Sequence, residues 1–127
     1  MKKTKHGDYE MKVAFPVFSK YGMHIVFTED LRDSHVSRFG DGGLADDMET
    51  DAMYVSSGAG HAHVFYKLRA RAGVVAHEAW HAIWGMFNWA GVDRWDNETT
   101  AYHLGYLVDK ITDFQIRAIN KSKGVKS

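Results

Sequence analysis

The segment His77-Glu78-Ala79-Trp80-His81 constrains this chain more than any other feature of the sequence. It is an H-E-x-x-H pattern, and it lies within Ala70–Ala90, which we predict to be a helix. Residues four apart on a helix share a face, so both imidazoles can reach one metal ion with Glu78 beside it. Two neutral histidines, an open position for water and a carboxylate that takes the proton of the water are the parts of a zinc-dependent hydrolytic site.

The pattern is unexpected for a chain of this composition. With eight His and five Glu in 127 residues, a random order would contain about 0.02 such patterns. The alternative interpretation is an ordinary helix that carries two surface histidines. The rarity of the pattern favours the metal site.

Composition narrows the class of protein. A chain of 127 residues with a hydrophobic fraction of 45% predicts one domain with one core, and we expect residues 1–8 and 122–127 to be flexible. The 16 basic and 16 acidic residues balance, so no strong field indicates nucleic acid or an anionic membrane as partner. The absence of cysteine excludes a thiolate zinc site and a cysteine nucleophile.

The N-terminus gives no targeting signal. It is basic, but no apolar stretch follows as in a signal peptide, and no apolar run approaches the length of a membrane span. We therefore expect a cytoplasmic protein.

The order of the predicted elements indicates an α+β fold. We expect a small, mostly antiparallel sheet of about four strands packed on the H-E-x-x-H helix and on a C-terminal helix that carries a glutamate. The expected strands are Asp8–Phe18, Met23–Thr28, Ala52–Ser56 and His61–Lys67, and the expected helices are Glu29–Phe39, Ala70–Ala90 and a last one from Asp96 or Asn97 to about Lys121. Pro16 places the first strand at an edge or ends it early, and the first two strands suit a hairpin. Thr28 is the expected cap of the first helix, and the last strand is expected beside the H-E-x-x-H helix.

A catalytic zinc site needs a third protein ligand. The downstream candidates are Asp93, Asp96, Glu98, His103, Asp109 and Asp113. Glu98 is the preferred one, because it falls on the first turn of the last helix and shares a helical stripe that we expect to be buried. That stripe consists of Glu98, Ala101, Tyr102, Gly105 and Val108. Close approach of the two helices is one reason for a glycine at position 105. His103 or Asp93 is the fallback ligand.

Further side chains are candidates for a second role in the site. Tyr102, His103, His61 and His63 are possible donors to a transition state, and the strand of His61 and His63 could instead supply an extra metal ligand. The alternative is that His61 and His63 face solvent and that Tyr102 is a buried packing residue. The four tryptophans suit a recognition surface, although aromatic residues on a central helix more often belong to the core. Residues 40–51 are acidic without the spacing of a calcium loop and suit a solvated loop or a lid.

The stretch from the H-E-x-x-H pattern to Trp95-Asp96-Asn97-Glu98-Thr99-Thr100-Ala101-Tyr102-His103-Leu104-Gly105-Tyr106-Leu107 resembles small phage- and prophage-encoded proteins with a gluzincin-like H-E-x-x-H. The resemblance covers about Val74–Asp109 and implies a minimal zincin. By it, His77, His81 and Glu98 bind one zinc ion and Glu78 is the base. In larger gluzincin peptidases an aspartate four residues beyond the glutamate supports a ligand histidine, whereas this chain has Tyr102 there. A phage origin implies the cytoplasm of the host.

The sequence leads to two hypotheses of function. The first is a small zinc metallopeptidase that acts on a peptide or protein, with a metal hydrolase for other amides as a variant, since the motif determines the centre and not the substrate. The second is a zinc-binding but inactive phage-encoded protein that binds or inhibits a host factor. The presence of Glu78 favours the first, because a degenerate site often loses its base. Cleavage specificity and oligomeric state do not follow from the sequence.

Overall fold

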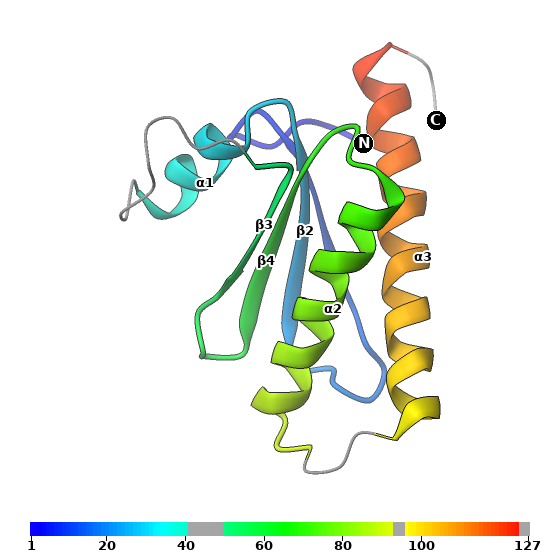
Figure 1. Ribbon diagram of the computed structural model, residues 1–127. Coiled ribbons are helices and arrows are strands. Elements are labelled where there is room, and N and C mark those ends of the chain that lie inside the picture. The colour runs from blue at the N-terminus through cyan, green and yellow to red at the C-terminus, as the bar shows by residue number, and fades with distance from the viewer. Residues whose placement is uncertain (41–49, 93–95, 125–127) are drawn as a thin grey trace.

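The computed structural model describes residues 1–40, 50–92 and 96–124, which adopt the α+β fold that the sequence predicts (Figure 1). The described part contains four strands and three helices. They are β1 (Tyr9–Val13), β2 (Gly22–Thr28), α1 (Leu31–Phe39), β3 (Ala52–Ser56), β4 (His61–Lys67), α2 (Ala72–Trp89) and α3 (Asn97–Ser122). None of these helices is both long and apolar enough to cross a membrane.

The four strands form one mixed sheet in the order β1-β2-β4-β3. The predicted hairpin of β1 and β2 is confirmed, and β1 is an edge strand that ends before Pro16. β3 and β4 are also antiparallel, whereas β2 and β4 run parallel with His24 opposite His63. A parallel neighbour requires a crossover connection, and here α1 and β3 lie within it. The sheet is therefore mostly antiparallel with β3 at its second edge.

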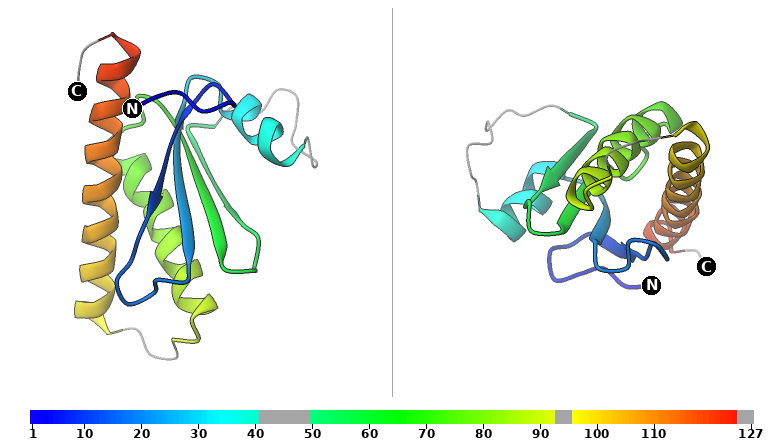
Figure 2. Two further views of the ribbon diagram at one scale, coloured as in Figure 1. Left: turned by 180° about the vertical axis from the view of Figure 1, so that it is seen from behind. Right: turned by 90° about the horizontal axis from the view of Figure 1, so that it is seen from below.

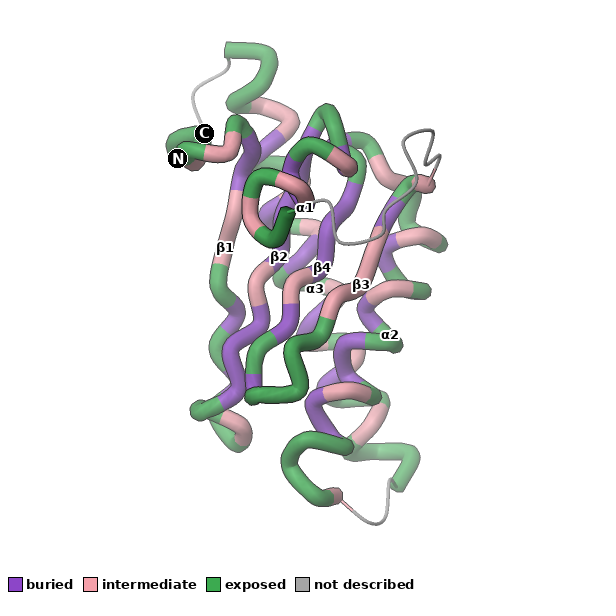
Figure 3. Tube along the Cα trace, turned by 90° about the vertical axis from the view of Figure 1, so that its left-hand side faces the viewer, coloured by how far each residue is buried: buried purple, intermediate pink, exposed green. Residues whose placement is uncertain are grey.

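The two faces of the sheet are covered differently. α2 and α3 lie on one face, where Ile25, Val64 and Tyr66 are fully buried, while α1 lies on the other face (Figure 2). There, Val26 and Phe65 pack with Leu31 of α1. Successive side chains of a strand point to opposite faces, so neighbouring residues of one strand belong to two separate hydrophobic clusters, one on each face of the sheet. Buried residues follow the strands and the inner side of α2, whereas the outer side of α2 is exposed (Figure 3).

α1 begins two residues later than predicted because a different side chain caps it. Asp30, not Thr28, is the cap, and its carboxylate accepts a hydrogen bond of 2.9 Å from the backbone N–H of Asp33. The hydroxyl of Thr28 instead donates to the carbonyl of Asp30 and accepts from Ser34. An aspartate at this position also interacts favourably with the positive end of the helix.

The predicted buried stripe of α3 is wrong. The residues that α3 buries are His103, Leu107, Ile111, Phe114 and Ala118. Of the predicted stripe, Val108 is half-buried and Glu98, Ala101, Tyr102 and Gly105 are exposed. A Cβ atom at Gly105 would have no neighbour within 4 Å, so close helix packing does not require this glycine.

A buried ion network joins the N-terminal segment and β1 to α1. The guanidinium of Arg38 donates to both carboxylate oxygens of Asp8, at 2.6 and 2.9 Å, and to Glu10 at 2.6 and 3.1 Å. Burial alone would raise the pKa of Asp8, but the hydrogen bonds from Arg38, Thr4 and Ser34 hold it below its ordinary value. Thr4 and Asp8 thus take part in this network, and the flexibility that we expect for residues 1–8 stays a prediction.

Candidate metal centre

His77 and His81 lie one turn apart on the exposed side of α2, as the H-E-x-x-H pattern predicts. Their Nε2 atoms are 3.3 Å apart, and the ring planes are inclined at 73°. Two nitrogen ligands of a tetrahedral zinc ion, each about 2.0–2.1 Å from the metal, are separated by about 3.3 Å. The separation of the two nitrogens therefore matches that of two neighbouring positions of a tetrahedral zinc ion.

Glu78 is half-buried and faces the sheet beside the histidine pair. It lines a hollow of about 330 Å³ together with His77, and the wall of this hollow is completed by Thr50, Asp51, Ala52, Gly73 and Val74. Burial and the nearby carboxylate of Glu78 both raise the pKa of Tyr66, whose hydroxyl donates to the carbonyl of Val75 at 2.9 Å. The carboxylate of Glu78 therefore lies near the buried phenol of Tyr66 as well as beside His77.

Tyr54 of β3 lies beside His81. Its ring lies nearly parallel to the imidazole, with 6.4 Å between centroids and 21° between planes. Its hydroxyl lies against Gly85, where an added Cβ would come within 2.1 Å of the oxygen. His77, His81 and Gly85 follow at four-residue spacing on one face of the helix. The glycine thus makes room for the tyrosine that packs on His81, a role that sequence reasoning missed although the spacing indicates it.

Gly85→Ala is expected to destabilise the protein by about 1–3 kcal/mol, because the methyl group overlaps the hydroxyl of Tyr54. The matched control Gly105→Ala places the same methyl in open space on α3 and is expected to stabilise by about 0.5–1 kcal/mol through helix propensity. Urea unfolding measures both. In a Tyr54→Ala background Gly85→Ala becomes neutral or stabilising. A Gly85→Ala effect that persists in that background would show that the clash is not with Tyr54.

A second hollow lies beyond His81 toward the C-terminal end of α2. Its volume is about 380 Å³, and its lining residues are Tyr21, Tyr54, Ser56, Gly58, Gly60, Trp84, Gly85, Asn88 and Trp89. The first hollow uses the early turns of α2 and the start of β3, and the second uses the late turns and the end of β3. The two hollows therefore follow the same edge of the sheet, with the histidine pair between them.

β3 turns backbone groups toward this edge, and one of them, the carbonyl of Ala52, accepts a hydrogen bond of 2.9 Å from the hydroxyl of Thr50. Lys67 donates its backbone N–H to the carbonyl of Asp51, and Ser57 donates to the carbonyl of His61. Along an antiparallel pair, every second residue of a strand turns its backbone N–H and C=O toward the neighbouring strand. The backbone groups of Ala52 and Tyr54 consequently point away from β4. We expected the strand His61–Lys67 to border the H-E-x-x-H helix. It does contact α2, but it is an inner strand, and β3 is the accessible one.

Glu98 is not brought to the histidine pair. It is exposed on the first turn of α3, which starts beside the C-terminal end of α2 and covers the β1–β2 side of the sheet (Figure 1). His77 and His81 face β3, on the other side of α2. Along α2, His81 lies eight residues before the helix end, or about 12 Å. In the described ranges, no third His, Asp or Glu places a ligand atom within 4.8 Å of both imidazoles.

The predicted transition-state donors also lie elsewhere. His61 and His63 point to the α1 face of the sheet, because their neighbours Ala62 and Val64 fill the core beneath α2. His63 is half-buried, so the expectation of two solvent-facing histidines holds for His61 alone.

The structure places the two α3 candidates, Tyr102 and His103, in opposite environments. Tyr102 is 67% exposed, so its prediction as a packing residue is wrong. His103 is buried against Phe15, Phe18 and Phe87, and its Nδ1 lies 2.8 Å from the carbonyl of Thr99. It is a core residue and does not reach His77 and His81, so it is not the third ligand.

The tryptophans of α2 are not core residues. Trp80, Trp84 and Trp89 are 39%, 53% and 42% exposed, contrary to the usual position of aromatic residues on a central helix. Trp95, the fallback ligand Asp93 and most of the acidic loop, 41–49, lie outside the described residues.

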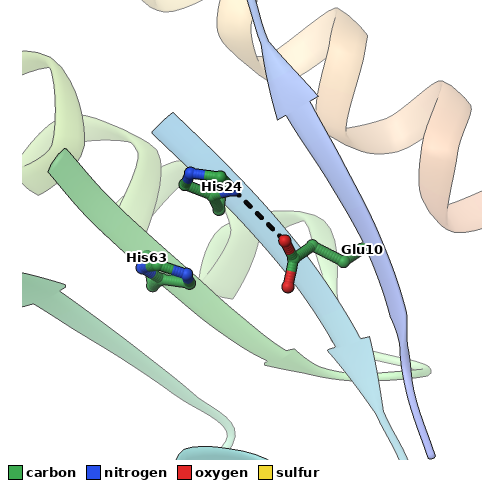
Figure 4. A group of neighbouring side chains, drawn as sticks. All are labelled: Glu10, His24 and His63. Atoms are coloured by element: carbon green, nitrogen blue, oxygen red, sulfur yellow. Dashed lines mark hydrogen bonds and ion pairs between the residues drawn. The ribbon is translucent and has the colours of Figure 1, made fainter. Parts of the chain in front are cut away.

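A second group of ligating side chains lies on the α1 face of the sheet. Glu10, His24 and His63 come from β1, β2 and β4, and their ligand atoms all lie within 4.8 Å of one another (Figure 4). This group could hold a metal ion. Sequence reasoning considered His63 alone, because nothing in the spacing of three residues on separate strands announces that they meet.

Comparisons of the chain with protein-family models, with curated proteins and with solved structures give no match.

Proposed function

We propose that the protein is a zinc-dependent hydrolase that cleaves peptide bonds in the groove between α2 and β3. The observation that carries the proposal is the 3.3 Å separation of the Nε2 atoms of His77 and His81, with Glu78 beside them in an open hollow. Exposure of both imidazoles leaves the remaining coordination positions accessible to water and substrate.

The roles of the side chains follow from their positions. A bound zinc ion would lower the pKa of its water toward about 7 and polarise the scissile carbonyl. Glu78 accepts the proton of the attacking water and delivers it to the leaving amine. Its half-buried position in the hollow with His77 holds the carboxylate near the reacting groups.

We assign the third ligand position to Asp51 in place of Glu98. Its carboxylate does not lie within 4.8 Å of both imidazoles in the structure, so it must move toward them when the metal binds. It lines the same hollow as His77 and Glu78, at the start of the edge strand. Its carboxylate is exposed and forms only a long ion pair of 3.7 Å with Lys67. An exposed pair of this kind contributes little stability, so the carboxylate can exchange it for a metal.

We predict that the protein binds zinc through His77 and His81 and that the double variant His77→Ala/His81→Ala loses this site. Asp51→Asn is expected to weaken zinc binding about 10- to 100-fold, because the site loses a carboxylate that contributes to its metal affinity. Glu98→Gln is expected to leave zinc binding unchanged. Competition titration against a chromogenic chelator measures the affinities. Weaker zinc binding by Glu98→Gln together with unchanged binding by Asp51→Asn would show that Glu98 is the third ligand. A double variant that binds as many equivalents of zinc as the wild type would refute the site.

The groove suits an extended peptide. The outward backbone groups of β3 can add a substrate strand to the sheet edge, which leads the chain past the histidine pair. The second hollow lies beyond the histidine pair, toward the C-terminal end of α2, and is bordered by Tyr21, Tyr54, Trp84 and Trp89. Aromatic walls favour a large apolar side chain of the substrate. We therefore assign the enzyme a preference for such a residue next to the cleaved bond.

Trp84→Ala is expected to reduce kcat/KM for peptides with a large apolar residue about 10-fold or more, because the side chain loses one wall of its hollow. Peptides with alanine at that position change little. Trp80→Ala is the matched control, since Trp80 is a similarly exposed tryptophan of α2 that does not line the hollow. A peptide library read by mass spectrometry makes the comparison. Equal losses for both peptide classes would contradict the assignment of the hollow.

A further inference from the structure

The α1 face of the sheet carries a polar cluster that the proposed hydrolase does not use. Glu10, His24 and His63 project from three adjacent strands toward one another (Figure 4). His24 and His63 are opposite each other in the β2–β4 register, and their rings stack with 4.5 Å between centroids. The Nδ1 atom of His24 lies 3.2 Å from a carboxylate oxygen of Glu10.

We propose that Glu10, His24 and His63 bind a second divalent metal ion, separate from the histidine pair of α2 and independent of the hydrolase activity. Two imidazoles and one carboxylate form a mixed nitrogen and oxygen donor set, which suits zinc and its neighbours such as cobalt(II). Calcium and magnesium prefer oxygen ligands alone. The class of ligand is therefore a transition-metal dication.

The surroundings hold the carboxylate ligand in position. One oxygen of Glu10 faces His24, while the other accepts hydrogen bonds from Arg38 at 2.6 and 3.1 Å. Arg38 is held in turn by Asp8. Hydrogen-bonded partners that orient the ligands are a regular feature of metal sites. Two carboxylates against one guanidinium leave the network with an excess negative charge, which attracts a dication.

The cluster is accessible to an ion. The side chains of His24 and Glu10 are 22% and 27% exposed. His63 also lines a cavity of about 310 Å³ with His35, Phe39, Val55, Ser57 and His61. The two stacked rings are inclined by 9° only, so one must turn about its side-chain bonds before both nitrogens point at one ion. Metal binding therefore changes the environment of both imidazoles, which NMR can detect.

The test uses the His77→Ala/His81→Ala background, in which the α2 site is absent. We expect this protein to bind one equivalent of zinc or cobalt(II) by calorimetry and native mass spectrometry, with shifted imidazole signals of His24 and His63. Adding His24→Asn/His63→Asn lowers the affinity at least about 10-fold, and Glu10→Gln weakens it in the same direction. His61→Asn, on the same face of β4, is the matched control and leaves binding unchanged.

The outcomes separate this site from the hydrolase centre. If the His77→Ala/His81→Ala protein binds no metal while the wild type binds one, the second site is refuted and the proposed hydrolase stands. Undiminished binding after His24→Asn/His63→Asn also refutes the site, provided that circular dichroism shows a folded protein. Two results together support two independent sites. His24→Asn/His63→Asn abolishes metal binding in the His77→Ala/His81→Ala background, and the same pair of changes leaves peptide hydrolysis intact in the otherwise unmodified chain.

Discussion

Glu78→Gln is expected to lower kcat for peptide hydrolysis by about 10²- to 10⁴-fold while the zinc content stays that of the wild type. This loss corresponds to about 3–5 kcal/mol of barrier. The amide keeps the shape of the side chain in its hollow beside His77 but cannot accept the proton of the attacking water. Steady-state kinetics and metal analysis of the same samples measure both quantities.

Two comparisons make this result decisive. Glu29→Gln, the same change at an exposed glutamate before α1, leaves both quantities at the wild-type level. Equal turnover and equal zinc in Glu78→Gln would exclude the hydrolase. The chain would then be a zinc-binding protein without catalysis, the second hypothesis from the sequence, and its effect would rest on binding a host factor.

The largest effect on stability is expected from Arg38→Met. The Arg38 side chain is 6% exposed and that of Asp8 is fully buried, so the variant leaves Asp8 as a buried charge without its cationic partner and leaves Glu10 with His24 alone. Removing one partner of a buried pair costs about 3–5 kcal/mol. Arg69→Met, at an exposed arginine, is the control and is expected to cost less than about 0.5 kcal/mol. Urea unfolding at neutral pH measures the two variants.

The effect of Arg38→Met is expected to shrink in acid. The hydrogen bond from His24, together with Arg38 and against the effect of burial, lowers the pKa of Glu10 from 4.5 to about 2, and the pKa of Asp8 is lowered as well. Carboxyl groups with lowered pKa values contribute stability above their ordinary pKa and lose it as the pH falls through the folded value. The difference between wild type and variant should therefore narrow from about pH 4.5 toward pH 2. A difference that is constant with pH would show that packing of the arginine stem dominates.

Local patterns predicted the elements well. The bounds of β3 and β4 are those expected from the sequence, and α2 differs from its prediction by two residues at the start and one at the end. Alternation of apolar residues between glycine-rich turns defines the strands without reference to the rest of the chain. The i, i+4 spacing likewise ensures that His77 and His81 meet, since a helix brings them together wherever it packs.

The third ligand shows where this reasoning fails. Two stripes of α3 have helical spacing, one through Glu98 and Gly105 and one through His103 and Leu107, and both contain residues that can be buried. Only the packing of α3 against α2 selects the second stripe. Because that packing turns Glu98 to solvent on the far side of α2, the ligand inferred from sequence order does not reach the histidines.

The amino-acid order alone therefore establishes the α+β class, the helix with the paired histidines and the carboxylate beside them. Each of these depends on contacts within a few residues of chain, whose geometry is fixed by backbone periodicity. The tertiary structure decides which strand lies at the edge beside the histidines and that the hydroxyl of Tyr54 packs against Gly85. It also brings Glu10, His24 and His63 together from three strands. These depend on sheet order and register, which are set by burial over the whole chain rather than by any local pattern.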